Sequence, residues 1–275
     1  KQTATYMITL KFIWHDCFVL ETPAFAAVFD FWKDGRRSAA SGEPPAFLSS
    51  IPEDKPLYVL VSHHHKDHFH RSIFNWEQVH PEIRFIISKD TERAARFMFR
   101  EKTVYNGFKP STEKVTVLRP GESFSDSLLT VDAFGSTDTG NSYLLTDANG
   151  MTAFHAGDLN AWIWKDESSE KEIEEAENAY LSIVKKIAER SSSIDFAMFP
   201  VDSRIGTDYW TGAYHFVRII DVARFFPMHF CLADDEDQLR QRMADACLFP
   251  VYANHSRGEY IALQHPYSSF ASSRP

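Results

Sequence analysis

The chain has few cysteines, and their number and spacing exclude one class of protein. It contains three, Cys17, Cys231 and Cys247, and none lies in a Cys-x-x-Cys pair. An odd and sparse count excludes a disulfide framework and predicts small buried residues rather than reactive thiols. This usage is typical of a reducing compartment, so we expect the protein to be cytoplasmic. The first residue is Lys1 rather than Met, which leaves open a processed leader segment.

Long apolar runs and an excess of positive charge are also absent. No stretch approaches the ~20 consecutive apolar residues of a membrane-spanning helix, so no membrane segment is expected. Lys and Arg number 29 against 38 Asp and Glu, which gives a formal net charge of −9. That sign disfavours a nucleic-acid-binding protein, because such proteins neutralise phosphates with basic side chains. We therefore expect a small-molecule partner, and the sequence leaves assembly into a homo-oligomer open.

Internal repeats, low-complexity tracts and an inter-domain linker are missing as well, so we expect a single domain over residues 1–275. Hydrophobic residues make up 44% and charged residues 24% of the chain, which is the usage of a folded globular protein. Phe is unusually common at 23 residues, and this predicts a core rich in aromatic rings.

Strand and helix signals interleave along the chain and indicate an α/β or α+β fold. Apolar alternation and short apolar runs predict strands at residues 7–13, 17–31, 57–61, 83–87, 115–118, 128–134, 142–146, 151–155, 194–199, 222–228 and 258–263. Apolar spacings of three and four predict helices at residues 91–102, 167–190, 214–220 and 235–248, and residues 33–56 are predicted to form a loop. Ser169 and Glu172 have the spacing of a capping box at the start of the longest helix.

The most informative segment is Ser62–His70, which contains five histidines and one aspartate directly after a strand of the buried type. Its His-x-His-x-Asp-His pattern supplies His63, His65, Asp67 and His68. Side chains alternate along an extended chain, so His63 and His65 point the same way and can bind one metal ion. Asp67 and His68 can then bind a second ion. A solvated histidine-rich loop with loose metal affinity is the alternative.

This motif, placed at the end of an apolar strand, resembles the metallo-β-lactamase-fold superfamily. Phe154–Asp158 resembles the superfamily's later strand that ends in Gly-Asp, whose aspartate bridges two metal ions, and Pro227–His229 resembles its final metal-binding histidine. The start of the chain, Ile8–Glu21, resembles the subgroup that includes ascorbate-6-phosphate lactonase. The resemblance covers residues 7–263 and implies a four-layer αβ/βα sandwich with two mixed sheets flanked by helices.

One position departs from the superfamily pattern, because the third histidine before the bridging aspartate is missing from residues 134–142. Asp138 is the strong ligand type in that segment, and we expect it to replace the histidine. The alternative is an ordinary turn residue beside Gly140. The resemblance then implies two divalent ions, with His63, His65 and Asp138 on the first, Asp67, His68 and His229 on the second, and Asp158 bridging them. Zn²⁺ is the expected metal, and the carboxylate at the first ion also admits Mn²⁺ or Fe²⁺.

Two further residues are candidates for substrate contact. Arg204 follows the strand at residues 194–199 and can bind a carboxylate or phosphate of a substrate, or form a surface salt bridge. His15 can support the metal ligands from beneath, or be a plain, partly buried histidine.

The ligand set and the resemblance predict an enzyme, a dinuclear metal-dependent hydrolase in which a metal-bound hydroxide attacks a small-molecule ester, lactone or phosphoester. Asp67 and Asp158 are the expected catalytic residues, and Asp67 can orient the hydroxide. Three alternatives stay open. The first is a nuclease of the same superfamily, which the negative charge disfavours, and the second is an iron-dependent redox protein at the same ligands. The third is a non-catalytic member whose metals are structural or absent.

Overall fold

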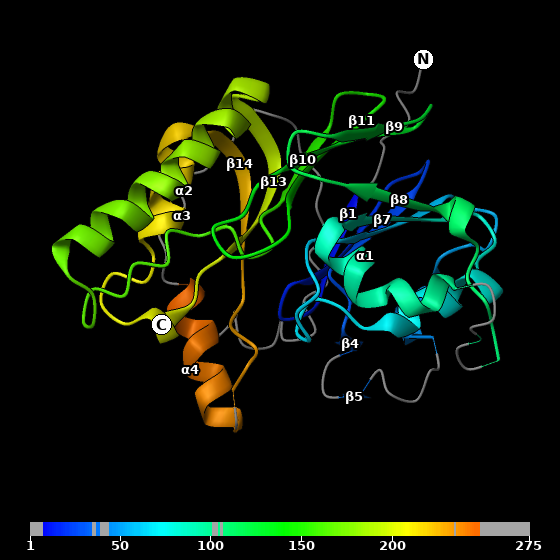
Figure 1. The fold of residues 1–275 in the computed structure, drawn as a ribbon, viewed down its shortest axis with the longest axis horizontal. Coiled ribbons are helices and arrows are strands. Elements are labelled where there is room, and N and C mark those ends of the chain that lie inside the picture. The colour runs from blue at the N-terminus through cyan, green and yellow to red at the C-terminus, as the bar shows by residue number, and fades with distance from the viewer. Residues whose placement is uncertain are drawn as a thin grey trace, which may run out of the picture. The chain divides into compact units, whose positions relative to one another are not determined.

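The structure is a computed structural model that describes residues 8–34, 37–38, 44–100, 104, 107–233 and 235–247 (Figure 1). These residues form two compact units. The N-terminal unit contains the described parts of residues 8–87 and 91–117, and the C-terminal unit contains those of residues 88–90 and 118–247. Each unit is built on a mixed six-stranded sheet.

The N-terminal unit has the strand order β1-β2-β3-β6-β7-β8. Its strands are β1 (Thr9–Trp14), β2 (Cys17–Glu21), β3 (Ala26–Phe29), β6 (Leu57–Val61), β7 (Ile83–Ser88) and β8 (Val115–Leu118), with a small hairpin of β4 (Lys33–Asp34) and β5 (Arg37–Ser38). β1, β2 and β3 pair antiparallel, whereas β3, β6 and β7 pair parallel. The helical segments are α1 (Lys89–Ala95) and the 3₁₀ helices at Ala46–Ser50, Arg71–Gln78, Arg96–Phe99 and Thr112–Lys114.

The core of the N-terminal unit is rich in aromatic rings, as the sequence predicts. All five residues of β6 are buried, because this strand lies between two parallel neighbours and is covered on both faces. The rings of Phe31 and Trp76 are 4.8 Å apart, and those of Phe74 and Phe85 are 5.0 Å apart. This packing fixes the end of β6, where the histidine-rich segment begins.

The C-terminal unit has the strand order β14-β13-β12-β11-β10-β9. Its elements are β9 (Ser123–Ser125), β10 (Leu129–Phe134), β11 (Ser142–Asp147), β12 (Thr152–His155), α2 (Glu170–Arg190), β13 (Ser193–Pro200), a 3₁₀ turn (Ser203–Ile205), α3 (Thr211–Ile219), β14 (Asp221–Met228) and α4 (Glu236–Cys247). β9 to β12 pair antiparallel, and β12, β13 and β14 pair parallel. In Figure 1, α2 and α3 lie side by side, and they contact β10 and β14 respectively.

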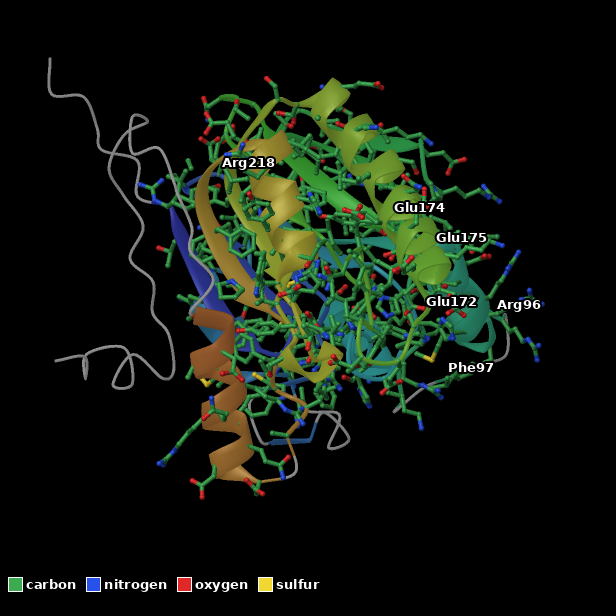
Figure 2. The ribbon with its side chains drawn as sticks, turned by 90° about the vertical axis from the view of Figure 1, so that its left-hand side faces the viewer. Arg96, Phe97, Glu172, Glu174, Glu175 and Arg218 are labelled. Atoms are coloured by element: carbon green, nitrogen blue, oxygen red, sulfur yellow. The ribbon has the colours of Figure 1, made fainter. Side chains whose placement is uncertain are left out.

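Helix α2 shows how the sequence sets an element of this unit. The Ser169 side chain and Glu172 form a complete capping box at its N-terminus, and Tyr180, Val184 and Ile187 form its buried face. Glu172, Glu174 and Glu175 lie on the exposed side of the helix, where charge stays in water (Figure 2). The predicted helix at residues 167–190 is therefore confirmed, with its first turn beginning at Glu170.

Most predicted elements are confirmed, and the fold class is as expected, with two mixed sheets and helices. The helix predicted at residues 91–102 begins earlier, and its second part tightens into the 3₁₀ helix at Arg96–Phe99. Short β9 was missed because its three residues are too few to show a period. The loop predicted at residues 33–56 contains the β4-β5 hairpin and a 3₁₀ helix. The strand predicted at residues 258–263 lies outside the described residues, and the single domain over residues 1–275 stays a prediction.

Candidate metal centre

His63 and His65 follow the end of β6 and bring their rings together. His63 is buried and His65 is exposed, and His63 Nε2 lies 3.0 Å from His65 Nδ1. The Ser62 hydroxyl contacts the other nitrogen of His63, Nδ1, at 2.9 Å. Two nitrogens that each lie about 2.1 Å from one ion are separated by roughly 3–3.5 Å. The spacing of these two rings therefore suits a shared metal ion.

His68 is held in place by a buried aspartate that the sequence reasoning missed. Its Nδ1 lies 2.8 Å from Asp30 Oδ2, and both residues are buried. Asp30 follows β3 directly, and its Oδ1 accepts a hydrogen bond from the backbone N–H of Ser62 at 2.7 Å. With Nδ1 occupied by the carboxylate, Nε2 is the ring atom that can bind a metal, as in carboxylate–histidine–metal arrangements.

Asp67 lies beside His15 and His68. Its Oδ2 is 3.5 Å from His15 Nε2 and 4.0 Å from His68 Nε2. Burial by itself raises the pKa of Asp67, but the hydrogen bond with His15 and the charges of His68 and His15 outweigh it, so the pKa falls below its ordinary value. Asp16, which sequence reasoning missed, lies 3.1 Å from His15 Nε2 and 3.4 Å from His68 Nε2. We use the name N-terminal cluster for His15, Asp16, Asp30, His63, His65, Asp67 and His68.

Asp158 and His229 form the centre of a second group, in the C-terminal unit. Asp158 is in the turn after β12, His229 follows β14, and His229 Nε2 lies 3.2 Å from Asp158 Oδ1. The ring of His229 is fixed from its other side, because its Nδ1 is 2.9 Å from Oδ2 of the buried Asp202. This is again the carboxylate–histidine arrangement that leaves Nε2 to a metal.

Arg204 is bonded to the same aspartate. Its Nε donates to both oxygens of Asp202 at 2.9 Å, and its Nη2 is 3.3 Å from His229 Nδ1. Burial raises the pKa of Asp202, but the hydrogen bonds and charges of His229 and Arg204 outweigh it, and the pKa is well below the usual range. Asp202 is therefore a carboxylate at all physiological pH values. Sequence reasoning missed this residue, which lies two residues after the end of β13.

Asp138 lies in the loop between β10 and β11, as an exposed side chain. One of its carboxylate oxygens lies within 4.8 Å of a carboxylate oxygen of Asp158. We call Asp138, Asp158, Asp202, Arg204 and His229 the C-terminal cluster. Asp138 is thus close to Asp158, and its role as the replacement ligand stays a prediction.

Backbone strain marks both clusters. Five described residues other than glycine have positive φ, namely His15, Asp30, Trp162, Asp208 and His229. His15, Asp30 and His229 belong to the clusters, and Trp162 contacts one of them, since its ring centroid is 5.5 Å from that of His229. The Trp162 indole also donates to the carbonyl of Asp158 at 2.8 Å. Such conformations cost about 1–3 kcal/mol each and are retained where a side chain must be aimed at a functional position.

The donor chemistry of each cluster fits divalent metal ions. His15, Asp67 and His68 offer ligand atoms within 4.8 Å of one another in the N-terminal unit, and Asp158 lies that close to His229 and to Asp138 in the C-terminal unit. Imidazole nitrogen with carboxylate oxygen is a zinc donor set, and the added carboxylates also suit Mn²⁺ and Fe²⁺. Both units therefore contain histidine–aspartate groups that could hold a divalent metal ion.

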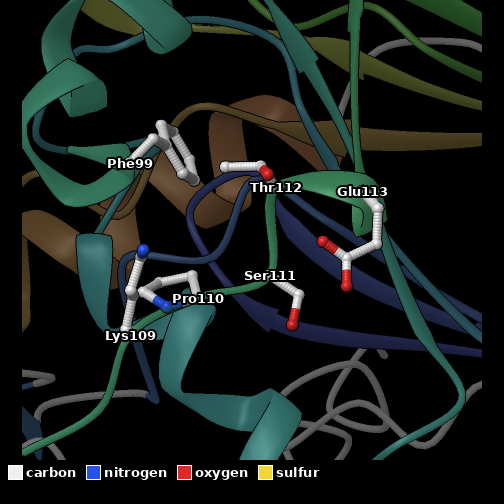
Figure 3. A pocket seen from close by; sticks show the side chains of 6 residues that line it. All are labelled: Phe99, Lys109, Pro110, Ser111, Thr112 and Glu113. Carbon is white, nitrogen blue, oxygen red and sulfur yellow. The ribbon is translucent and has the colours of Figure 1, made fainter. Parts of the chain in front are cut away.

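A separate cleft of about 380 Å³ in the N-terminal unit contains none of the predicted ligands. It is lined by Phe99, Lys109, Pro110, Ser111, Thr112 and Glu113 (Figure 3). The side chain of Glu77 holds the segment that carries Ser111, because Glu77 accepts from the Ser111 backbone N–H at 2.9 Å and pairs with Lys114 at 3.2 Å.

Comparison with known proteins agrees with this fold. The family described as the beta-lactamase superfamily domain matches residues 9–229, so the chain belongs to this family. No curated protein matches the chain significantly. The lactonase-like subgroup stays a prediction.

Solved structures share the fold at low sequence identity. Igni18, a metallo hydrolase from the archaeon Ignicoccus hospitalis, is 15% identical over 95% of this chain and 96% of its own, with a TM-score of 0.56. The metallo-beta-lactamase fold protein YhfI from Bacillus subtilis is 14% identical over 91% of this chain and 89% of its own, with a TM-score of 0.52. CmlA, a diiron beta-hydroxylase from Streptomyces venezuelae, is 14% identical over 96% of this chain and 54% of its own, with a TM-score of 0.56. The chain thus has the fold of these structures, and it carries histidine–aspartate groups able to hold metal.

No helix within the described ranges is both long and apolar enough to cross a bilayer.

Proposed function

We propose that this chain is a dinuclear metal-dependent hydrolase that cleaves a small-molecule ester, lactone or phosphoester. The observation that carries the proposal is that the ligands expected in each unit converge within that unit. The proposed centre would hold two divalent ions, with Zn²⁺ as the expected metal. The ligands are His63, His65 and Asp138 for one ion, Asp67, His68 and His229 for the other, and Asp158 for both.

The chain's own residues have distinct tasks in this proposal. Bound divalent ions supply a water molecule whose pKa is lowered from 15.7 towards ~7, and so a nucleophile at neutral pH. Asp67 stays ionised because its pKa is lowered, and its carboxylate orients that water by accepting a hydrogen bond. His15, 3.5 Å from Asp67, holds this carboxylate in place. Asp158 is the second catalytic carboxylate, and it would help to hold the divalent metal.

Arg204 is the proposed contact for an anionic substrate group. Its guanidinium is held on Asp202, and its side chain is still 33% exposed. A guanidinium held in a fixed plane is well suited to a carboxylate or phosphate. This supports a substrate with at least one negative group, although the same arginine also orients His229 through Asp202.

The test is the metal content of protein purified without a His-tag or chelator. We expect about two equivalents of Zn per chain in the wild type. In Asp158→Ala we expect both equivalents of Zn and the hydrolytic activity to be lost. Asp221→Ala is the matched control, because Asp221 is an exposed carboxylate at the far end of β14 from His229. Two tightly bound metals in Asp158→Ala would contradict the proposed centre.

An iron-dependent redox enzyme is the second candidate. It is supported by the carboxylate of Asp138 among the expected ligands and by that of Asp16 beside His68, because oxygen donors favour iron and manganese over zinc. The fold is also shared with CmlA, which is a diiron hydroxylase. Iron in the purified protein, together with an iron-dependent absorption band, would favour this candidate over the hydrolase.

The proposed setting is a reducing compartment such as the cytoplasm, with a small molecule as partner. Cys17 is a free thiol, and both Cys17 and Cys231 are buried, which supports this setting. Burial, and after it the neighbouring carboxylates, raise the pKa of Cys17 well above its ordinary value, so this thiol is kept protonated and unreactive.

A further inference from the structure

Two loops that carry candidate metal ligands are joined by a single threonine. Thr137 precedes Asp138 in the loop between β10 and β11, and Asn160 lies two residues after Asp158 in the turn that follows β12. The Thr137 hydroxyl donates to the carbonyl of Asn160 at 2.5 Å. The same hydroxyl accepts from the backbone N–H of Asn160 at 3.1 Å. The backbone N–H and C=O of Asn160 are thus both hydrogen-bonded to the side chain of Thr137.

Asn160 is a rigid anchor for this contact. Its side chain is 1% exposed, and its Oδ1 accepts from the backbone N–H of Ala161 at 2.8 Å. The same oxygen packs against Gly212 of α3, where an added Cβ would lie only 1.9 Å from it. Gly212 is itself bonded to α2, because its carbonyl accepts from the Tyr180 hydroxyl at 2.6 Å. A shift of Asn160 would therefore disturb the packing of two helices.

Asp138 has to be held near Asp158 against an electrostatic cost. Their carboxylate oxygens lie within 4.8 Å, and two like charges at this distance repel when no cation lies between them. Asp138 is exposed, and its turn is shaped locally by its own N–H donating to Ser136 Oγ at 3.2 Å and by Gly140 at a φ of 72°. These contacts lie within the turn, so they cannot fix it relative to Asp158. The Thr137 hydroxyl makes that connection.

We propose that Thr137 is a positioning residue that holds Asp138 beside Asp158 and so completes the metal site at which aspartate stands in place of histidine. The inference rests on the proposed function, because it assigns Thr137 to the same centre. A hydroxyl is needed, since only a group that donates and accepts can bind both the carbonyl and the N–H of Asn160. Valine has the shape of threonine but can do neither.

The experiment is a Co²⁺ titration of the full chain after metal removal, followed by visible absorption and by calorimetry. The variants are Thr137→Val, Thr137→Ser and Thr139→Val. Thr139 is the matched control, because it lies in the same turn and its side chain makes no hydrogen bond within the described part of the chain. Thr137→Ala is the second test, in case the branched valine disturbs folding, and circular dichroism checks each variant.

Wild type is expected to bind two equivalents of Co²⁺. In Thr137→Val and Thr137→Ala one of the two should bind about 10- to 100-fold more weakly, with a changed absorption band for that ion. Thr137→Ser should restore the wild-type affinity and spectrum, and Thr139→Val should retain them. Unchanged affinity and spectrum in folded Thr137→Val or Thr137→Ala overturn this inference alone. A wild-type protein that binds no Co²⁺ overturns both this inference and the proposed centre.

Discussion

At the scale of single residues, the two clusters share one type of contact between an aspartate and a histidine. A buried aspartate binds Nδ1 of a histidine in each, at 2.8 Å for Asp30 with His68 and at 2.9 Å for Asp202 with His229. The contact fixes the plane and the tautomer of the ring, so that Nε2 is presented to a metal. Asp30 and His229 themselves adopt positive φ, so the backbone is strained at the residues that form these contacts.

Asp202→Asn should weaken metal binding without unfolding the protein. The amide has the shape of the carboxylate but lacks its charge, so it polarises His229 less and leaves Arg204 without its counter-charge. We expect affinity for Zn²⁺ to fall about 10- to 100-fold, measured by competition with a chromophoric chelator. Asp221→Asn should bind Zn²⁺ like the wild type. Equal affinities in Asp202→Asn and wild type would show that Asp202 does not support His229 as a ligand.

At the scale of elements, α2 is stabilised at its N-terminus by its capping box. Ser169 Oγ accepts from the backbone N–H of Glu172, and Glu172 Oε2 accepts from that of Ser169 at 2.8 Å. Ser169→Ala should therefore lower the free energy of unfolding by about 1 kcal/mol, which corresponds to about 2–4 °C in Tm for a chain of this size. Ser182→Ala, at an exposed position of the same helix, should change Tm much less. Equal shifts in the two variants would refute the role of the cap.

Glu77 connects two 3₁₀ helices of the N-terminal unit, Arg71–Gln78 and Thr112–Lys114. Burial raises the pKa of Glu77, but hydrogen bonds from Ser111 and Lys114 outweigh it and lower the pKa below 4.5. A carboxylate with a lowered pKa in the folded state contributes stability above its unfolded pKa, and this contribution is lost as the pH falls through the folded pKa.

Glu77→Gln should therefore be less stable than wild type at pH 7 by about 1–2 kcal/mol, because it loses charge-assisted hydrogen bonds. The difference should narrow as the pH falls below about 4.5, measured by urea unfolding at a series of pH values. Glu113→Gln is the control, because Glu113 is exposed and lines the cleft that also contains Ser111. Its stability should equal that of the wild type at each pH. A difference that stays constant with pH would exclude this role for Glu77.

At the scale of the whole molecule, the proposed centre links metal binding to stability. Ions that bind the folded chain and not the unfolded one stabilise it by about 2.7 kcal/mol at a free concentration 100-fold above Kd. Treatment with a chelator should lower the unfolding temperature, and added Zn²⁺ should restore it. In Asp158→Ala the Zn²⁺-dependent shift should be much smaller. A wild-type unfolding temperature that changes neither with chelator nor with added Zn²⁺ would contradict tight metal binding.

Much of the fold could be predicted from the sequence because its signals are local. The five apolar residues of β6, the capping box of α2 and the Asn149-Gly150 turn between β11 and β12 are each set by neighbours in the chain. The extent of the helix after β7 could not be predicted, because packing tightens its second part into a 3₁₀ helix. β9 was missed for a similar reason, since only pairing with β10 defines it.

For the site, the sequence by itself determined which residues have metal-binding chemistry, because ligand type and spacing are properties of the chain. His63, His65, Asp67 and His68 were identifiable from one short motif, and Asp158 and His229 from the resemblance of their segments to the superfamily. Only the tertiary structure decided which other side chains contact these candidate ligands and fix their orientation. Asp16, Asp30, Asp202 and the hydroxyl of Thr137 act across 23 to 52 residues of sequence, as the bonds of Asn160 to Thr137 and the contact of Asp16 with His68 show. Such contacts depend on where folding places distant segments, and no local pattern encodes them.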